Sequence, residues 1–96
     1  MKKMYKPLPD FLRIDDSEIH GQGLFATKDI EENSYLGISH YFLAKKIIRT
    51  PLGGFINHSD KPNCYCDSGY GFRELYTLRE IKKGEELTVY YMLYEV

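Results

Sequence analysis

The chain has 96 residues, the size of one small domain with a single hydrophobic core. Thirteen basic residues stand against fourteen acidic ones, so the net charge of −1 offers no excess of positive charge for following nucleic-acid phosphates. No apolar run reaches membrane length, and the start "MKKMYKPLPD" lacks the apolar segment of a signal peptide. We therefore expect one domain over 1–96, with 1–10 as a flexible or extended N-terminus, that binds neither nucleic acid nor a membrane.

Short strand patterns, separated by Gly, Pro, Asn and Asp, run along most of the chain. The predicted strands are residues 12–14, 23–26, 34–39, 55–57, 64–66, 72–78 and 86–92. The segment 41–49 fits either a helix or a strand, because a short apolar run does not fix the period. The pattern predicts a mostly β fold built from several small sheets.

Two charged segments, 28–36 and 79–87, repeat one pattern: base, acid, Ile, two charged residues, then Asn33 or Gly84, and a Leu three positions later. Asn and Gly both tolerate the left-handed backbone conformation. We predict for each segment a helical turn with an inward Ile, a sharp reversal and a strand. The alternative is a coincidence between two charged turns.

The last predicted strand places Leu87, Val89 and Tyr91 on one face, because successive side chains alternate along a strand. Leu87 and Val89 mark this face as the buried one. The phenol of Tyr91 therefore points inward and needs a hydrogen-bond partner. An inward Tyr can also be a plain core residue.

The segment "GFINHSDKPNC" (54–64) raises a different question. Its apolar pair Phe55-Ile56 leads directly into three hydrogen-bonding side chains, Asn57-His58-Ser59. Burying such groups costs free energy unless each one finds a partner. Either a loop exposes these side chains, or a bound molecule satisfies them.

Four segments, in this order, resemble the motifs of SET domains. They are "HGQGLFAT" (20–27), "SYLG" (34–37), "FINHSDKPNC" (55–64) and "LREIKKGEELTVYY" (78–91). The resemblance covers positions 18–91. It is specific, because Asn-His-Ser-x-x-Pro-Asn followed by Gly-Glu-Glu-Leu-Thr is rare by chance.

The SET family consists chiefly of protein-lysine methyltransferases that use S-adenosylmethionine. The resemblance implies the SET-type β-clip fold, with several small antiparallel sheets and a C-terminal pseudoknot beside the Asn-His-Ser strand. It also implies transfer of a methyl group from S-adenosylmethionine to a lysine amine of a protein or peptide substrate. The alternatives are a catalytically weak or inactive SET-fold module that binds cofactor or peptide, and a structural β-domain in which the motif serves only folding.

Site residues follow from the resemblance, position by position. The implied cofactor-binding residues are Gly21, Gln22, Gly23, Asn57 and His58. The implied catalytic residues are Tyr91 and Tyr35, and the substrate channel is expected to include Tyr65 and Tyr94. Taken alone, Gly-Gln-Gly is also a plain hairpin turn.

These residue types suit in-line methyl transfer, which depends on alignment and on exclusion of water. The attacking lysine has an unperturbed pKa of about 10.4 and must lose its proton, which an apolar channel favours. Tyrosine rings can surround the lysine stem while their hydroxyls orient the amine. Glycines allow a ligand to approach the backbone closely.

No metal site is expected, since His20, His40 and His58 lack any known ligand spacing, and two cysteines cannot close a zinc site. We expect His20 and His40 to be surface or loop residues. Two cysteines without a disulfide framework indicate a reduced, intracellular protein, cytoplasmic or, in a eukaryote, nuclear.

The stretch between Gly37 and Phe55 is much shorter than is usual in the family. In larger members the insert at this place forms one wall of the peptide groove. A homodimer that supplies the missing wall is a hypothesis.

Overall fold

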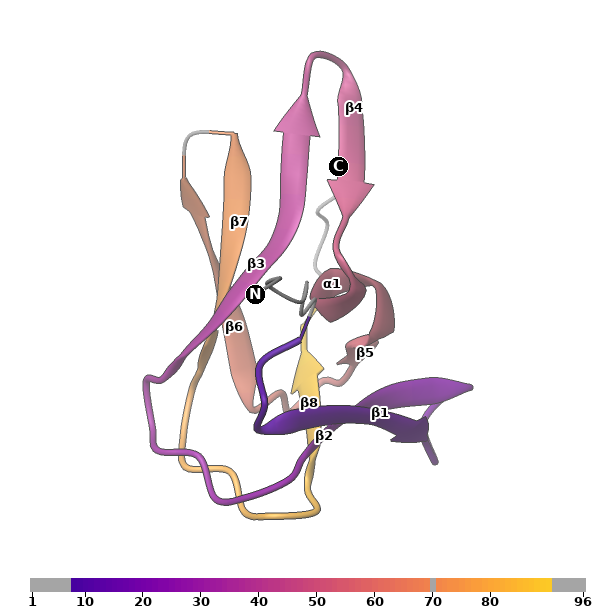
Figure 1. Cartoon of the computed structure of the whole chain (residues 1–96), viewed down its shortest axis with the longest axis vertical. Helices are drawn as coiled ribbons and strands as arrows, with labels where there is room; N and C mark the ends of the chain where they lie inside the picture. The colour runs from indigo at the N-terminus through magenta and orange to yellow at the C-terminus, as the bar shows by residue number, and fades with distance from the viewer. Residues whose placement is uncertain (1–7, 70, 91–96) are drawn as a thin grey trace, which may run out of the picture.

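The computed structural model describes residues 8–69 and 71–90 (Figure 1). The elements are β1 (Leu12–Asp16), β2 (Gln22–Ala26), β3 (Tyr35–Leu43), β4 (Lys46–Arg49), α1 (Pro51–Phe55), β5 (Asn57–His58), β6 (Cys64–Gly69), β7 (Phe72–Thr77) and β8 (Glu86–Val89). The expected mostly β fold is confirmed. Within the described residues, no helix is long and apolar enough to cross a membrane.

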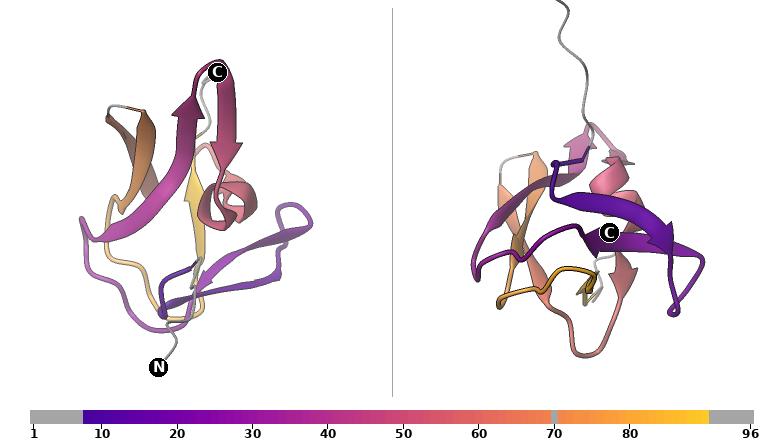
Figure 2. Two further views of the ribbon diagram at one scale, coloured as in Figure 1. Left: turned by 45° about the horizontal axis from the view of Figure 1, so that its top comes forward. Right: turned by 60° about the horizontal axis from the view of Figure 1, so that its bottom comes forward.

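The strands form two four-stranded sheets, with the orders β1-β2-β8-β5 and β4-β3-β7-β6. Every strand pair is antiparallel except β5 and β8, which run parallel, with Asn57 opposite Thr88 and His58 opposite Val89. The Asn-His-Ser segment therefore lies directly beside the C-terminal strand. Figures 1 and 2 show the β3–β4 hairpin extending away from the β1–β2 hairpin.

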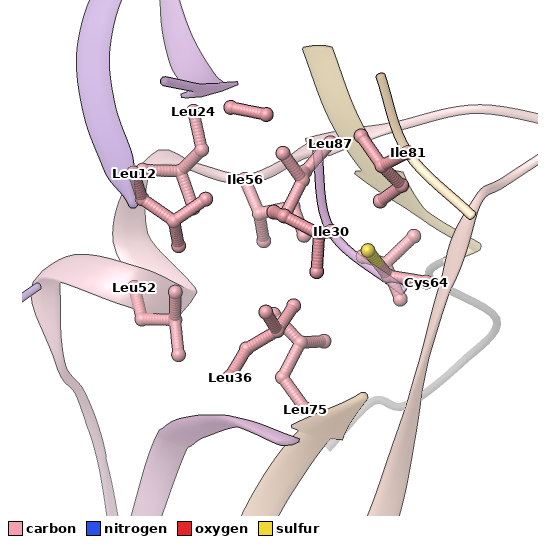
Figure 3. Packing of buried hydrophobic residues seen from close by; sticks show 12 residues of the cluster. Leu12, Leu24, Ile30, Leu36, Leu52, Ile56, Cys64, Leu75, Ile81 and Leu87 are labelled. Carbon is pink, nitrogen blue, oxygen red and sulfur yellow. The ribbon is translucent and has the colours of Figure 1, made fainter. Parts of the chain in front are cut away.

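Aliphatic side chains from both sheets meet in one core (Figure 3). Leu24 of β2, Leu87 of β8, Leu75 of β7 and Leu52 of α1 all belong to this one cluster, and Figure 3 shows Leu75 beside Leu36 of β3. Full burial of one such side chain contributes about 1.5–3 kcal/mol. The core thus joins the sheet that carries Asn57 to the sheet that carries the tyrosines.

The two similar segments, 28–36 and 79–87, pair with each other through a short antiparallel bridge. Ile30 and Ile81 are both buried and exchange two backbone hydrogen bonds, of 2.7 and 2.8 Å. Asn33 (φ 63°) and Gly84 (φ 89°) then reverse the chain into β3 and β8. The inward Ile, the reversal and the strand are confirmed. The predicted helical turn is wrong, because the Ile backbone groups pair with each other across the molecule instead of within a turn.

The ambiguous segment 41–49 is a β-hairpin, with Tyr41 opposite Ile48 and Ala44 at a positive φ of 55° in its turn. The strand predicted over 55–57 is partly wrong. Residues 51–55 form α1, which begins after Thr50, whose Oγ1 accepts a hydrogen bond from the Gly53 amide at 3.3 Å. A Thr cap followed by Pro favours a helix start. Only Asn57 and His58 then pair as a strand.

Asn63 of the Pro-Asn turn is buried and fixes the position of β8. Its Nδ2 donates to the Glu86 carbonyl at 2.8 Å, and its Oδ1 accepts from the Thr88 amide at 2.8 Å. One side chain therefore satisfies two backbone groups of β8. Thr88 is also buried, although it alternates with Leu87 and Val89, and its Oγ1 accepts a hydrogen bond from the Asn63 amide at 3.3 Å.

Candidate functional site

The side-chain amide of Asn57 lies beneath the turn that joins β1 to β2. Its Nδ2 is 3.1 Å from the His20 carbonyl oxygen and 3.2 Å from the Gln22 carbonyl oxygen. It is also 3.1 Å from Ser17 Oγ and 2.9 Å from Glu86 Oε2. An amide carries two N–H groups, so these four acceptors share them. The structure thus brings Asn57 and the Gly-Gln-Gly turn together, 35 residues apart in sequence.

Ser17 and Glu86 complete this polar cluster, and neither was predicted as a site residue. Ser17 Oγ donates to the Glu86 carboxylate, with distances of 2.8 and 2.9 Å to its two oxygens. The same Ser17 oxygen accepts from the Ile19 amide at 2.9 Å. Strand alternation places Glu86 on the face opposite the core residue Leu87. This is the feature of the sequence from which a role for Glu86 outside the core could be predicted. We name Ser17, Asn57 and Glu86 the turn-anchoring cluster.

The two glycines of the turn are required for different reasons. Gly21 has φ +48°, and a Cβ there would meet no atom within 4 Å, so its backbone borders open space. At Gly23 a Cβ would collide with the Glu86 carboxylate and stand 3.0 Å from Asn57 Nδ2. Close approach of a ligand can therefore explain Gly21, whereas Gly23 is fixed by the turn-anchoring cluster.

His58, the next residue of β5, has different surroundings. Its side chain is 41% exposed, and Nε2 lies 3.3 Å from Asp60 Oδ1. Its ring centroid is 5.0 Å from that of Tyr90, with the rings tilted by 39°. Asn57 is thus engaged with the turn, while His58 and Tyr90 form an aromatic pair at the surface.

A cavity of about 300 Å³ lies between the second sheet and the end of β8. Its walls include His40, Cys66 and Arg73 from the sheet, and Val89 and Tyr90 from the C-terminal strand. The predicted residues Tyr91 and Tyr94 lie outside the described residues. Val89, the last residue of β8, and Tyr90 are the last residues that the structure describes.

Tyr35 and Tyr65 lie on one face of the second sheet, on either side of Tyr76. The ring centroids are 5.4 Å apart for Tyr35 and Tyr76, and 5.5 Å apart for Tyr65 and Tyr76. The Tyr65 hydroxyl donates to Asn33 Oδ1 at 3.0 Å. Both Tyr65 and Cys66 line the cavity, and Cys66 Sγ lies 3.9 Å from Ser39 Oγ. The structure brings the two predicted tyrosines together, and Cys66 is a cavity residue that sequence reasoning missed.

His40 is buried, so its expected surface position is wrong, whereas His20 is exposed as expected. The register of β3 against β7 shifts between Ile38 and His40, and both Ser39 and His40 turn inward. Ser39 Oγ lies 2.8 Å from His40 Nδ1. Burial lowers the pKa of His40, and the charges of Arg73 and Arg49 lower it further.

Cys64 and Cys66 are free thiols. Burial raises the pKa of Cys64 to about 12, and burial also raises the pKa of Cys66. Both shifts disfavour the thiolate, which is the nucleophilic form of cysteine. In residues 8–69 and 71–90, no group of three His, Cys, Asp or Glu side chains could hold a metal ion.

Comparison with known proteins identifies the family. The sequence profile of the SET domain matches residues 43–92. The chain belongs to the SET domain family. A crystal structure of a Plasmodium falciparum protein assigned as a histone methyltransferase has the same fold as this SET domain, with a TM-score of 0.72. It is 20% identical and the match covers 86% of this chain and 94% of that one.

Three curated relatives are similar in sequence to this SET domain. The trithorax histone-lysine N-methyltransferases of Drosophila virilis and Drosophila melanogaster are each 30% identical over 125 aligned positions, which cover 95% of this chain but only 3% of theirs. A Schizosaccharomyces pombe histone-lysine N-methyltransferase named as specific for H3 lysine 37 is 29% identical, covering 83% of this chain and 72% of its own.

Proposed function

We propose that this SET domain transfers a methyl group from S-adenosylmethionine to the side-chain amine of a lysine in a protein substrate. The observation that carries the proposal is the contact of Asn57 with the Gly21–Gly23 turn, because it joins both segments of the implied cofactor site. Family membership and the histone-lysine methyltransferase names of its relatives support the same activity. The rival function is a module of the same fold that binds cofactor or peptide without turnover.

The residues of the turn fit a zwitterionic cofactor that carries an aromatic base. The backbone at Gly21 borders open space, and the exposed His58 ring beside Tyr90 offers an aromatic surface. In the proposal, Gly21, Gln22, Gly23, Asn57 and His58 hold S-adenosylmethionine, which supplies the electrophilic methyl group. Ser17 and Glu86 act as positioning residues, because they hold Asn57 and the turn in one geometry.

The proposed lysine channel combines Tyr91 as the central catalytic tyrosine with Tyr35, Tyr65 and Tyr94. Their phenols would orient the amine, and their rings would favour its neutral form by excluding water. Cys66 faces the cavity next to Val89 and Tyr90, so we add it to the proposed wall. The relatives' names point to histones or similar intracellular proteins as the substrate class.

A homodimer that completes the substrate groove is also proposed. The β3–β4 hairpin supports it, since Leu43 is 55% exposed and Ile47 and Ile48 are each 45% exposed. Exposed apolar patches often mark protein contacts. Light scattering should then give a dimer mass that falls to the monomer mass in Ile47→Glu, and a monomer at high concentration would remove this part of the proposal.

Calorimetry with S-adenosylmethionine tests the cofactor site. We expect the wild-type chain to bind and Asn57→Ala to bind roughly tenfold more weakly or worse, because the turn carbonyls lose the Asn57 donor. Ser59→Ala is the matched control, since the Ser59 hydroxyl accepts only from the Lys61 amide at 3.0 Å and should leave affinity unchanged. Equal affinity of wild type and Asn57→Ala would place the cofactor elsewhere.

A further inference from the structure

Four side chains that can donate hydrogen bonds stand in one row across the second sheet. His40 of β3 is the register partner of both Arg49 on β4 and Arg73 on β7. Arg73 is in turn the register partner of Ser68 on β6. Side chains of directly opposed residues lie on the same face of a sheet and close together. We name Arg49, His40, Arg73 and Ser68 the donor row.

The donor row forms part of the wall of the cavity between the second sheet and the end of β8. His40, Arg73 and Ser68 all line this cavity. His40 is buried, Arg73 is half-buried, and Ser68 is exposed. The Arg73 guanidinium lies 5.5 Å from the centroid of the Phe42 ring, and this contact helps to hold it in place. The row therefore presents a guanidinium of restricted position to the cavity.

Acidic side chains near the donor row in sequence lie on the other face of the sheet. Glu74 follows Arg73 on β7, and Asp67 precedes Ser68 on β6, so alternation directs both carboxylates away from the row. Among the described residues that line the cavity, none is Asp or Glu. The described part of the cavity wall therefore contains positive charge and donors without a carboxylate.

The charge of Arg73 acts on other groups of the cavity. Burial lowers the pKa of His40, and the charges of Arg73 and Arg49 lower it further. Burial raises the pKa of Cys66, while a hydrogen bond with Ser39 and the charge of Arg73 oppose that rise. A bound anion would be attracted by both guanidiniums, and guanidinium groups bind carboxylates and phosphates through paired hydrogen bonds.

We propose that the donor row binds an oxyanion side chain of the protein substrate, a carboxylate or a phosphate, beside the lysine that is methylated. The inference rests on the proposed function, because that function places the lysine at the Cys66 wall of the same cavity. Ser68 is two residues from Cys66 on β6, so the two positions are roughly 6.7 Å apart. Alternate side chains of an extended peptide are separated by the same distance. The anionic residue therefore lies within two positions of the target lysine.

Fluorescence anisotropy tests the donor row without any methyl transfer. The probes are labelled heptapeptides of Gly and Ser with a central lysine, in which one of the two positions on either side of the lysine carries Glu, Gln, phosphoserine or Lys. Each peptide is titrated with the full chain. At one position or more, we expect the Glu peptide to bind roughly fivefold more tightly than the Gln peptide, and the difference should shrink as salt is added.

Arg73→Gln should remove the preference for Glu over Gln, and Arg73→Glu should reverse it in favour of the Lys peptide. Arg49→Gln, at an exposed position, should reduce the preference roughly twofold, and it tests the row even if the Arg73 variants fail to fold. The matched control is Arg13→Gln, which removes an exposed guanidinium from β1 on the first sheet and should leave the preference unchanged.

The outcomes separate this inference from the proposed function. Equal binding of the Glu, phosphoserine and Gln peptides by the wild-type chain would overturn the inference, even if the chain methylates lysine. A wild-type preference in the folded Arg73 and Arg49 variants would overturn it as well. A preference that depends on these arginines would support the donor row even if no methyl transfer is found. Tighter binding of the phosphoserine peptide than of the Glu peptide would identify the oxyanion as a phosphate.

Discussion

Gly23 determines the geometry of the candidate cofactor site at the scale of a single residue. The Glu86 carboxylate and the Asn57 amide occupy the volume that any side chain at position 23 would need. Both groups also bond to Ser17, so they cannot move apart without losing hydrogen bonds. One absent methyl group therefore allows the turn-anchoring cluster to exist.

Gly23→Ala should lower the free energy of unfolding by about 1–3 kcal/mol, because the new methyl group forces a half-buried polar cluster apart. Cofactor affinity should fall together with stability. Urea unfolding and calorimetry measure the two effects. The matched control is Gly54→Ala in α1, where a Cβ meets no atom within 4 Å and the change should be neutral or stabilising. Equal stability of Gly23→Ala and wild type would contradict the observed packing.

His40 is the residue that should make stability depend on pH. Its folded-state pKa is lowered from 6.5 by burial, so the unfolded chain binds the extra proton first as the pH falls. The stabilisation is complete above the unfolded pKa and is lost as the pH falls below it. We expect the free energy of unfolding to decrease as the pH falls below about 6.5.

His40→Asn should flatten this part of the pH profile, and His20→Asn, at an exposed site, should leave it unchanged. The carboxyl groups of Asp15 and Glu85 do not interfere, because their pKa values are lowered and they titrate in more acidic solution. Urea unfolding at a series of pH values makes the measurement. A profile that is the same in wild type and His40→Asn would show that another group is responsible.

Among the elements, β8 depends on a side chain outside any strand. Asn63 bonds to the backbone of Glu86 and Thr88 and so continues the support that β5 gives to the same strand. β8 carries Glu86 to the turn-anchoring cluster and Val89 to the cavity. The Pro-Asn turn thus holds together the two halves of the candidate site.

Asn63→Ala should destabilise the fold by about 2–4 kcal/mol, because it leaves a buried carbonyl and a buried amide of β8 without their partner. Lys61→Ala, at an exposed position of the same turn, should change stability by less than about 0.5 kcal/mol. Thermal or urea unfolding of both variants provides the comparison. A loss no larger in Asn63→Ala than in Lys61→Ala would contradict this role.

The elements that the sequence predicts well are those defined by nearby residues. Alternation and turn residues locate β1, β2, β7 and β8, and the pattern around Ile30 and Ile81 predicts the two reversals. Helix α1 is missed because two glycines obscure its Thr-Pro start. The burial of His40 is missed because an irregularity in β3 breaks the alternation. These errors arise where the backbone departs from regular geometry.

The candidate site is predicted less completely than the fold. The family motifs identify Asn57 and the Gly-Gln-Gly turn, and the structure brings them together. Ser17 and Glu86 are separated by 69 residues, and nothing local in the sequence indicates their contact. The position of Cys66 beside the cavity depends on the register of β6, and a predicted strand does not determine this register. Contacts that only the tertiary fold creates are the ones that sequence reasoning misses.

The whole molecule is a SET domain in which one aliphatic core joins two small sheets with different tasks. The sheet β1-β2-β8-β5 carries the turn-anchoring cluster, and the sheet β4-β3-β7-β6 carries a wall of the cavity, to which Tyr65 and Cys66 both contribute. Strand β8 is part of the first sheet, and Val89 at its end borders the cavity. In the proposed function, cofactor and lysine are presented from opposite sides of the C-terminal strand.

Methyl transfer by the purified chain tests the central claim most directly. The chain is incubated with methyl-labelled S-adenosylmethionine and a cell lysate, and the proteins are hydrolysed to amino acids. Label should appear in methylated lysine, and Tyr91→Phe should reduce it or change the number of methyl groups while calorimetry still shows cofactor binding. Cofactor binding by the wild-type chain without any labelled lysine, in a lysate that a known histone-lysine methyltransferase does label, would contradict the account.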